Sequence, residues 1–114
     1  MNFKRTIKIY KTYFVEFYYP LPEKVKDKIK YVLKYIQEEE NIPAKYFKHI
    51  INVKGLYEIR VEYEGNIYRI FCCLDRGMIV ILFNGFQKKS QKTPEKELKI
   101  ARKLMTEYFN EQNK

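Results

Sequence analysis

Two arginines stand close together in the sequence, one on each side of Gly65. Arg60 lies before this glycine and Arg69 after it, in segments rich in apolar and aromatic residues. A guanidinium group binds phosphate in a bidentate manner and stabilises negative charge that develops on it. The two side chains could therefore hold a phosphate group. They could equally form cross-strand salt bridges with Glu58 and Glu62.

A polar segment, 87–92, holds the second group of chemically useful side chains. It contains three lysines and two glutamines and directly follows Phe86. A lysine supplies a point charge and can transfer a proton when its pKa is lowered, and an aromatic ring can stack on an unpaired base. The segment is either a solvated loop or the rim of a binding site. Because neighbours in an extended chain diverge, we expect unequal roles for Lys88, Lys89 and Lys92.

Together these side chains can cleave RNA without a metal ion or a cofactor. In that reaction the 2′-OH attacks the adjacent phosphate and leaves a 2′,3′-cyclic end and a free 5′-OH. The same side chains can also bind RNA without cleaving it. Other chemistries find little support, because the sequence has a single histidine, His49, only four glycines and one serine, Ser90, without triad partners. We expect His49 on the surface of a helix or at an interface.

The whole chain is strongly basic and of the size of one domain. It has 114 residues and a formal net charge of +9, so we expect a single domain over residues 1–114. Such a charge attracts polyanions, although it can also serve only to keep a protein soluble. No apolar run is long enough to span a membrane and no signal-like stretch follows the first residues. We therefore expect a soluble, cytoplasmic protein without membrane contact.

Periodicity and turn residues predict the elements that position these side chains. They are one or two strands in Thr6 to Tyr19, a helix from Glu23 to Glu40, a short helix from Ala44 to Ile50, strands at Leu56 to Glu64, Asn66 to Leu74 and Met78 to Phe83, and a last helix with Thr93 as N-cap and Pro94 in its first position. The fold class is α+β, with a small antiparallel sheet packed on N-terminal helices and a C-terminal helix. The strand from Met78 is apolar on both faces, which predicts that both faces are covered.

The hairpin brings the two arginines together. If it turns at Gly65 or Asn66, odd positions of its first arm share a face with even positions of its second. Arg60 and Arg69 then lie near each other on the opposite face. Cys72 and Cys73 point to different faces, and we expect both to be packing residues.

The second half of the chain resembles a known toxin family. The resemblance covers Gly55 to Phe109 and rests on "LYEIR", "YRIF", an apolar strand leading into "NGF", and "KKSQKTP" before an acidic helix start. This order and spacing are similar to the HigB-type branch of the RelE/ParE toxin superfamily and to phage-derived proteins of the same domain. The first half matches only in its order of elements.

The resemblance implies a microbial-RNase-like RelE fold and a toxin that cuts mRNA on the ribosome. Its partner would be a neutralising antitoxin, for which we expect a helix-turn-helix protein. The site residues that it implies are Arg60, Arg69, Lys88 and Lys89 as catalytic residues, and Lys54, Phe86, Gln91 and Lys92 as RNA-binding residues. Some relatives place a histidine or tyrosine near the end of the chain for proton transfer, and Tyr108 is the nearest candidate, although it also fits the buried stripe of the last helix. The alternatives are a ParE-type inhibitor of DNA gyrase and a non-catalytic binding module.

Overall fold

The computed structural model describes residues 4–113, which form three helices and one five-stranded sheet of order β1-β5-β4-β3-β2. The elements are, in chain order, β1 (Thr6–Ile9), α1 (Tyr13–Tyr18), α2 (Glu23–Glu38), β2 (Phe47–His49), β3 (Leu56–Tyr63), β4 (Asn66–Asp75), β5 (Ile79–Lys88) and α3 (Glu95–Gln112). The predicted α+β class is confirmed. None of the helices in residues 4–113 is long and apolar enough to cross a membrane.

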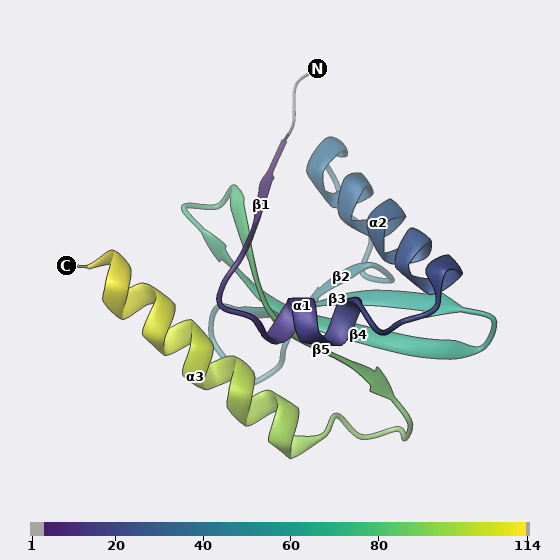
Figure 1. Ribbon diagram of the computed structural model, residues 1–114. Helices are drawn as coiled ribbons and strands as arrows, with labels where there is room; N and C mark the ends of the chain where they lie inside the picture. The colour runs from purple at the N-terminus through teal and green to yellow at the C-terminus, as the bar shows by residue number, and fades with distance from the viewer. Residues whose placement is uncertain (1–3, 114) are drawn as a thin grey trace.

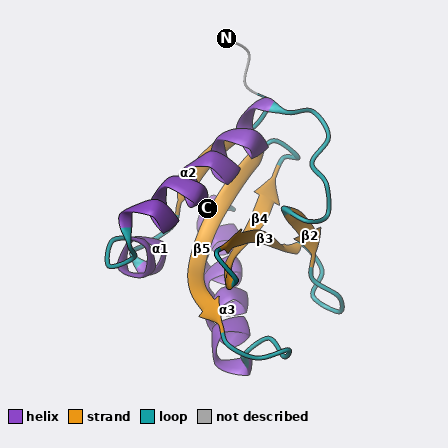
Figure 2. Cartoon of the chain, turned by 90° about the vertical axis from the view of Figure 1, so that its right-hand side faces the viewer, coloured by secondary structure: helices purple, strands orange, loops and turns teal. Residues whose placement is uncertain are grey.

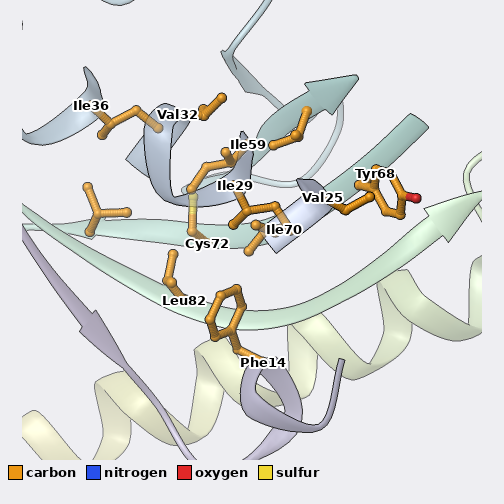
Figure 3. Packing of buried hydrophobic residues seen from close by; sticks show 12 residues of the cluster. Phe14, Val25, Ile29, Val32, Ile36, Ile59, Tyr68, Ile70, Cys72 and Leu82 are labelled. Atoms are coloured by element: carbon orange, nitrogen blue, oxygen red, sulfur yellow. The ribbon is translucent and has the colours of Figure 1, made fainter. Parts of the chain in front are cut away.

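Helices cover both faces of the sheet. The two N-terminal helices lie on one face and α3 on the other, as the views from two sides show (Figures 1 and 2). The buried residues of α2 have the helical spacing on which the prediction of this helix rests: Val25, Ile29, Val32 and Ile36. Figure 3 shows these side chains packed against strand residues such as Ile59 and Ile70. The sheet therefore has a separate apolar core on each face.

The central hairpin forms as predicted, with Arg60 directly opposite Arg69. Its two-residue turn, Glu64 and Gly65, has φ angles of 48° and 81°, and positive φ at both positions suits a tight hairpin. Odd positions of β3 and even positions of β4 share the α1/α2 face, as predicted: Ile59, Val61, Tyr68, Ile70 and Cys72. The opposite face carries the two arginines.

The prediction of an antiparallel sheet is wrong for one strand. The pairs β2–β3, β3–β4 and β4–β5 are antiparallel, but β1 pairs with β5 in parallel, from Thr6 opposite Ile79 to Ile9 opposite Leu82. The sheet is therefore mixed. A parallel pair needs a long crossover connection, and here the first two helices and three strands lie between the partners. Apolar patterning predicts strands but does not reveal the direction of their partners.

The prediction that Thr6 to Tyr19 is entirely strand is wrong in its second half. Lys11 has a φ of 61°, which ends the extended backbone after β1. The chain then forms α1, whose Phe14, Phe17 and Tyr18 have helical spacing and pack against the core. Aromatic residues favour strands in general, but their burial at helical spacing overrides that preference here.

The predicted short helix from Ala44 to Ile50 is also wrong. This segment contains β2, in which Phe47 pairs with Ile59 of β3. The Phe47 ring stacks on the Tyr57 ring with centroids 5.0 Å apart. His49 is exposed on this edge strand and not on a helix. Cross-strand aromatic packing, which depends on a partner strand, decides the conformation.

Strand β5 is longer than predicted and continues through Asn84-Gly85-Phe86 to Lys88. Its residues Val80 to Phe83 are buried, in agreement with the prediction that both faces are covered. A Cβ atom on Gly85 would lie 2.4 Å from the Phe17 ring, so the glycine allows α1 to pack directly on the strand backbone. The strand thus carries part of the lysine segment out of the core.

Helix α3 begins one residue later than predicted. Pro94 is its N-cap and makes no side-chain cap hydrogen bond, so Thr93 lies outside the helix. Its buried residues, Ala101, Leu104 and Tyr108, follow the predicted stripe. The buried Asn84 donates from Nδ2 to the carbonyl oxygen of Glu97 (3.0 Å) and to its carboxylate (3.1 Å). This contact ties the first turn of α3 to β5, the two elements that flank the intervening loop.

Cys72 and Cys73 are free, buried and part of the cores on opposite faces of the sheet. Burial raises the pKa of both thiols, that of Cys73 to about 12. Protonated thiols of this kind behave as small apolar groups, and the prediction that both are packing residues is confirmed.

Candidate RNA-binding site

Arg69 is the centre of a row of three side chains that crosses three strands. It lies opposite Arg60 on β3 and opposite Phe86 on β5. The row belongs to the face that α3 covers, but α3 packs on the far end of that face, around Leu56, Cys73 and other apolar residues. Figure 1 shows the β3–β4 hairpin extending beyond α3. The arginines are therefore at the end of the sheet that the helix leaves open.

A β-bulge brings Lys88 to the same face. Ile70 pairs with Gly85, whereas Cys72 pairs with Leu82, so β5 contains one more residue than β4 between these pairs. An extra residue reverses the faces to which all later side chains point. Lys88 therefore pairs with Ile67 on the arginine face, and Gln87 points to the other side. Without the bulge the lysine would face away from Arg69.

These side chains line an open pocket of about 490 Å³ at the end of the sheet. Its lining residues are Arg60, Glu62, Ile67, Arg69, Lys88, Lys89, Ser90 and Gln91. Four of them are cationic and one is a carboxylate. A concave surface with this excess of positive charge attracts phosphate groups. The pocket draws on three strands and on the loop that leads to α3.

Glu58 forms ion pairs with both arginines. Its Oε1 lies 2.7 Å from Nε of Arg69 and 3.7 Å from Nε of Arg60. The Arg69 side chain is only 5% exposed, and burial together with the positive charge of Arg60 lowers its pKa. One carboxylate therefore faces two guanidinium groups, which leaves a net positive charge. Such a site gains from an added anion.

The salt-bridge alternative is correct for Glu58 but does not describe the whole arrangement. Glu62 lines the pocket and makes no ion pair within 4.0 Å among the described residues. Arg60 also donates from Nη1 to the carbonyl oxygen of Ala44, at 3.4 Å. Both arginines are thus oriented by the protein, and both line the same cavity. Orientation by Glu58 and binding of a phosphate are compatible.

The structure gathers five of the eight expected site residues in the pocket: Arg60, Arg69, Lys88, Lys89 and Gln91. Phe86 is only 8% exposed and packs against Phe71 with ring centroids 5.4 Å apart, so it is a packing residue. Lys92 is exposed outside the pocket lining. Lys54 precedes β3 at the end covered by α3, since its neighbour Gly55 approaches Met105. Lys54 and Lys92 are thus not brought together with the arginines.

Sequence reasoning missed three pocket residues: Glu62, Ile67 and Ser90. Glu62 and Ile67 pair across the hairpin, so the register that predicted the arginine pair also predicts their position. The Ser90 hydroxyl donates to the carbonyl oxygen of Lys92 at 3.2 Å, which shapes the loop. Ser90 belongs to the polar segment 87–92 that the sequence offered as the rim of a site, but the sequence did not single it out from the lysines around it.

Tyr108 is outside the pocket. Its hydroxyl donates to Oδ2 of Asp75 at 2.6 Å. Asp75 ends β4, six residues from Arg69, which at the rise of a strand is a distance of about 20 Å. Burial, followed by this hydrogen bond, raises the pKa of Tyr108 to about 12. The tyrosine is therefore a structural residue of α3 and cannot reach a phosphate bound by the arginines.

The comparisons with known proteins give one family. A family model described as phage derived protein Gp49-like matches residues 16–106, which include every residue that lines the pocket. No curated protein matches the chain.

Proposed function

The chain belongs to the phage-derived Gp49-like family, within the RelE/ParE-like toxin superfamily, and on this premise we propose that it is the toxin of a type II toxin–antitoxin pair. We propose further that it is an endoribonuclease that cleaves mRNA on the ribosome and needs no metal ion. The observation that carries the cleavage proposal is the pair of oriented arginines, Arg60 and Arg69, in one basic pocket with Lys88 and Lys89. The partners would be ribosome-bound mRNA and an antitoxin that neutralises the toxin.

In the proposed reaction the 2′ oxygen of one nucleotide attacks its own 3′ phosphate. The bond from phosphorus to the 5′ oxygen of the next nucleotide breaks, and a 2′,3′-cyclic phosphate and a 5′-OH result. Arg60 and Arg69 would meet the negative charge that builds up on the phosphate oxygens in the transition state. The 2′-OH gives up a proton and the departing 5′ oxygen takes one, so the reaction also needs an acceptor and a donor.

The pocket offers a group for each proton transfer. Glu62 is the carboxylate in the lining, whereas Glu58 is already engaged by Arg69 at 2.7 Å. We assign the acceptor role to Glu62. Lys88 is half-buried beside the arginines and Lys89 is exposed at the rim. We assign donation to Lys88, because the group nearer the arginines is nearer the phosphate.

The substitution Arg69→Lys tests this function. It keeps a cation beside Glu58, so the ion pair and the fold should survive, but it removes the planar fork that holds a phosphate bidentately. We expect single-turnover cleavage on programmed ribosomes to slow by about a hundredfold. The matched control is Arg102→Lys on the exposed side of α3, which should cleave like the parent. Arg69→Ala is a poorer test, because it also leaves the largely buried Glu58 without its close partner.

Two results would contradict the proposal. A folded Arg69→Lys protein that cleaves at the parental rate would remove the arginine pair from the reaction. Intact transcripts together with a loss of DNA supercoiling after induction would favour a ParE-type gyrase inhibitor. New 5′-OH ends in ribosome-associated mRNA, which primer extension maps, are the result that we expect.

A further inference from the structure

A second pocket adjoins the first. It has a volume of about 280 Å³ and is lined by Lys28, Lys45, Tyr46, Arg60 and Glu62. Arg60 and Glu62 also line the first pocket. The two cavities therefore meet at these side chains, and together they make one groove. Three cations and one carboxylate line its second part, so the excess of positive charge continues beyond the arginine pair.

The short length of β2 creates this second pocket. β2 covers β3 only from Tyr57 to Ile59. Beyond Ile59, the backbone N–H of Arg60 donates to the carbonyl oxygen of Tyr46 at 2.8 Å. The turn before β2 is thus fixed beside Arg60, and α2 supplies Lys28 from the other side of the sheet edge. Three separate elements converge on one cavity at the edge of β3.

The ammonium group of the exposed Lys45 lies against an aromatic ring. Its Nζ lies 5.0 Å from the centre of the Tyr46 ring, within the range of a cation–π contact. The Tyr46 ring is in turn packed against Tyr35, with centroids 5.3 Å apart. An ammonium group that is oriented before binding loses less conformational entropy when it meets an anion. The other lysine of this pocket, Lys28, has a similar contact, with its Nζ 5.2 Å from the centre of the Tyr31 ring.

We propose that the second pocket binds a phosphate that neighbours the scissile one on the same RNA strand. This inference rests on the proposed function, which places the scissile phosphate at Arg69. A single strand carries one phosphate per nucleotide, and proteins hold such strands in basic grooves that follow the backbone. Arg60, between the two pockets, contacts both phosphates. The groove thus fixes the strand on one side of the cleavage point, and the second pocket acts in binding and not in the chemical step.

The test combines a protein variant with a modified substrate. Lys28→Ala/Lys45→Ala removes both lysines, and Lys30→Ala, an exposed lysine on α2 outside both pockets, is the matched control. On the substrate, an mRNA with one neutral methylphosphonate linkage removes the charge of a single phosphate, on either side of the cleaved one. Single-turnover cleavage on programmed ribosomes gives the half-saturating toxin concentration and the maximal rate for each combination.

We expect the double variant to raise the half-saturating concentration by about tenfold and to leave the maximal rate unchanged. The neutral linkage should do the same to the parent on one side only, and the same linkage should add nothing in the double variant. The inference is overturned if the double variant behaves like Lys30→Ala, or if variant and linkage weaken binding additively. An acidic peptide that binds the parent and fails to bind the double variant, without any effect on RNA, would assign the pocket to a protein partner and would also overturn it.

The Arg69→Lys protein, measured in parallel, separates the two proposals. If Arg69→Lys loses cleavage and Lys28→Ala/Lys45→Ala has no effect, only the inference about the second pocket is contradicted. A parent that does not cleave, or an Arg69→Lys protein that cleaves like the parent, contradicts the proposed function and this inference with it.

Discussion

Lys88 and Lys92 belong to the same short segment but have different surroundings. Lys88 is half-buried on β5 and lines the pocket with Arg69, whereas Lys92 is exposed outside it. We expect Lys88→Ala to lower the maximal cleavage rate by about a hundredfold, as for a lost proton donor. Lys92→Ala should leave that rate unchanged. It should make the slope of log binding constant against log salt concentration shallower by about 0.7, the value for one phosphate contact on a single strand. Single-turnover cleavage at several salt concentrations measures both effects.

Equal behaviour of the two variants would contradict this prediction. If both bind and cut like the parent, the segment is a solvated loop. If Lys92→Ala slows cleavage as much as Lys88→Ala does, the strand that carries Lys88 does not position the donor.

Tyr108 makes stability depend on pH in the alkaline range. Burial and the hydrogen bond to Asp75 raise its pKa to about 12, from an ordinary value of 10. The folded state thus holds the proton more tightly than the unfolded state does. This contribution to stability is fully present below about pH 10 and is lost as the pH rises towards 12. The free energy of unfolding should fall over this range.

The substitution Tyr108→Phe tests this assignment. Urea unfolding at pH values from about 9 to about 12 should show a shallower decline in the variant than in the parent. The decline should not vanish, because burial and a hydrogen bond to Glu111 also raise the pKa of Tyr10 to about 12. Tyr13→Phe is the control, since that side chain is exposed. Slower cleavage by a folded Tyr108→Phe protein would show that this tyrosine acts in the site after all.

At the residue scale, part of the site follows from the sequence. Hairpin register is a local property, because the turn at Gly65 fixes which side chains face each other, and so Arg60 and Arg69 could be placed together. The position of Lys88 depends on a bulge next to Gly85. A glycine inside a strand can mark a bulge, but the predicted strand ended at Phe83 and did not include it. The grip of Glu58 on both arginines depends on rotamers, which alternation along a strand does not determine.

Gly85 links the packing of α1 to the strand that carries Lys88. A Cβ atom at this position would lie 2.4 Å from the Phe17 ring, so Gly85→Ala forces either the ring or the whole helix to move away from the strand. We expect a loss of about 1–3 kcal/mol in the free energy of unfolding, as is usual for overpacking. Phe17→Leu in the same protein should recover part of that loss, because it removes the ring with which the added methyl group clashes. Urea unfolding of the single and double variants measures this coupling.

Additive effects in that cycle would contradict the contact between α1 and Gly85. A Gly85→Ala protein as stable as the parent would do so as well. Phe17→Leu alone serves as the reference for the core volume that the smaller side chain leaves empty.

At the element scale, local signals predicted most helices and strands, and long-range contacts decided the rest. The apolar stripe of α2 and the hairpin are local patterns, and both were predicted. The segments that were assigned wrongly, α1 and β2, are short and owe their conformation to partners elsewhere. Phe14 belongs to the same apolar cluster as the buried residues of α2, and Phe47 stacks on Tyr57. Neither partner can be identified from the residues next to them.

The net charge of +9 should govern how the whole molecule meets its partners. Opposite charge speeds the encounter of two macromolecules, and salt screens it over about 8 Å at physiological ionic strength. For an acidic antitoxin segment we expect the association rate to fall clearly as salt rises, while the dissociation rate changes little. Stopped-flow association at several salt concentrations measures both. An association rate that is constant across this series would show that the charge does not steer the partner.

The bulge in β5 has a consequence for comparing this chain with its relatives. Between Ile70 and Cys72, β5 holds one residue more than β4. In a gene that surplus is a single codon, and in an alignment it is a single gap. A relative that lacks this residue keeps the column of Lys88 opposite Ile67 and on the arginine face, provided that the gap is placed at the bulge. An alignment that omits the gap moves that relative's cation into the column of Gln87, so a cation that is missing from the column of Lys88 should first be sought one column earlier.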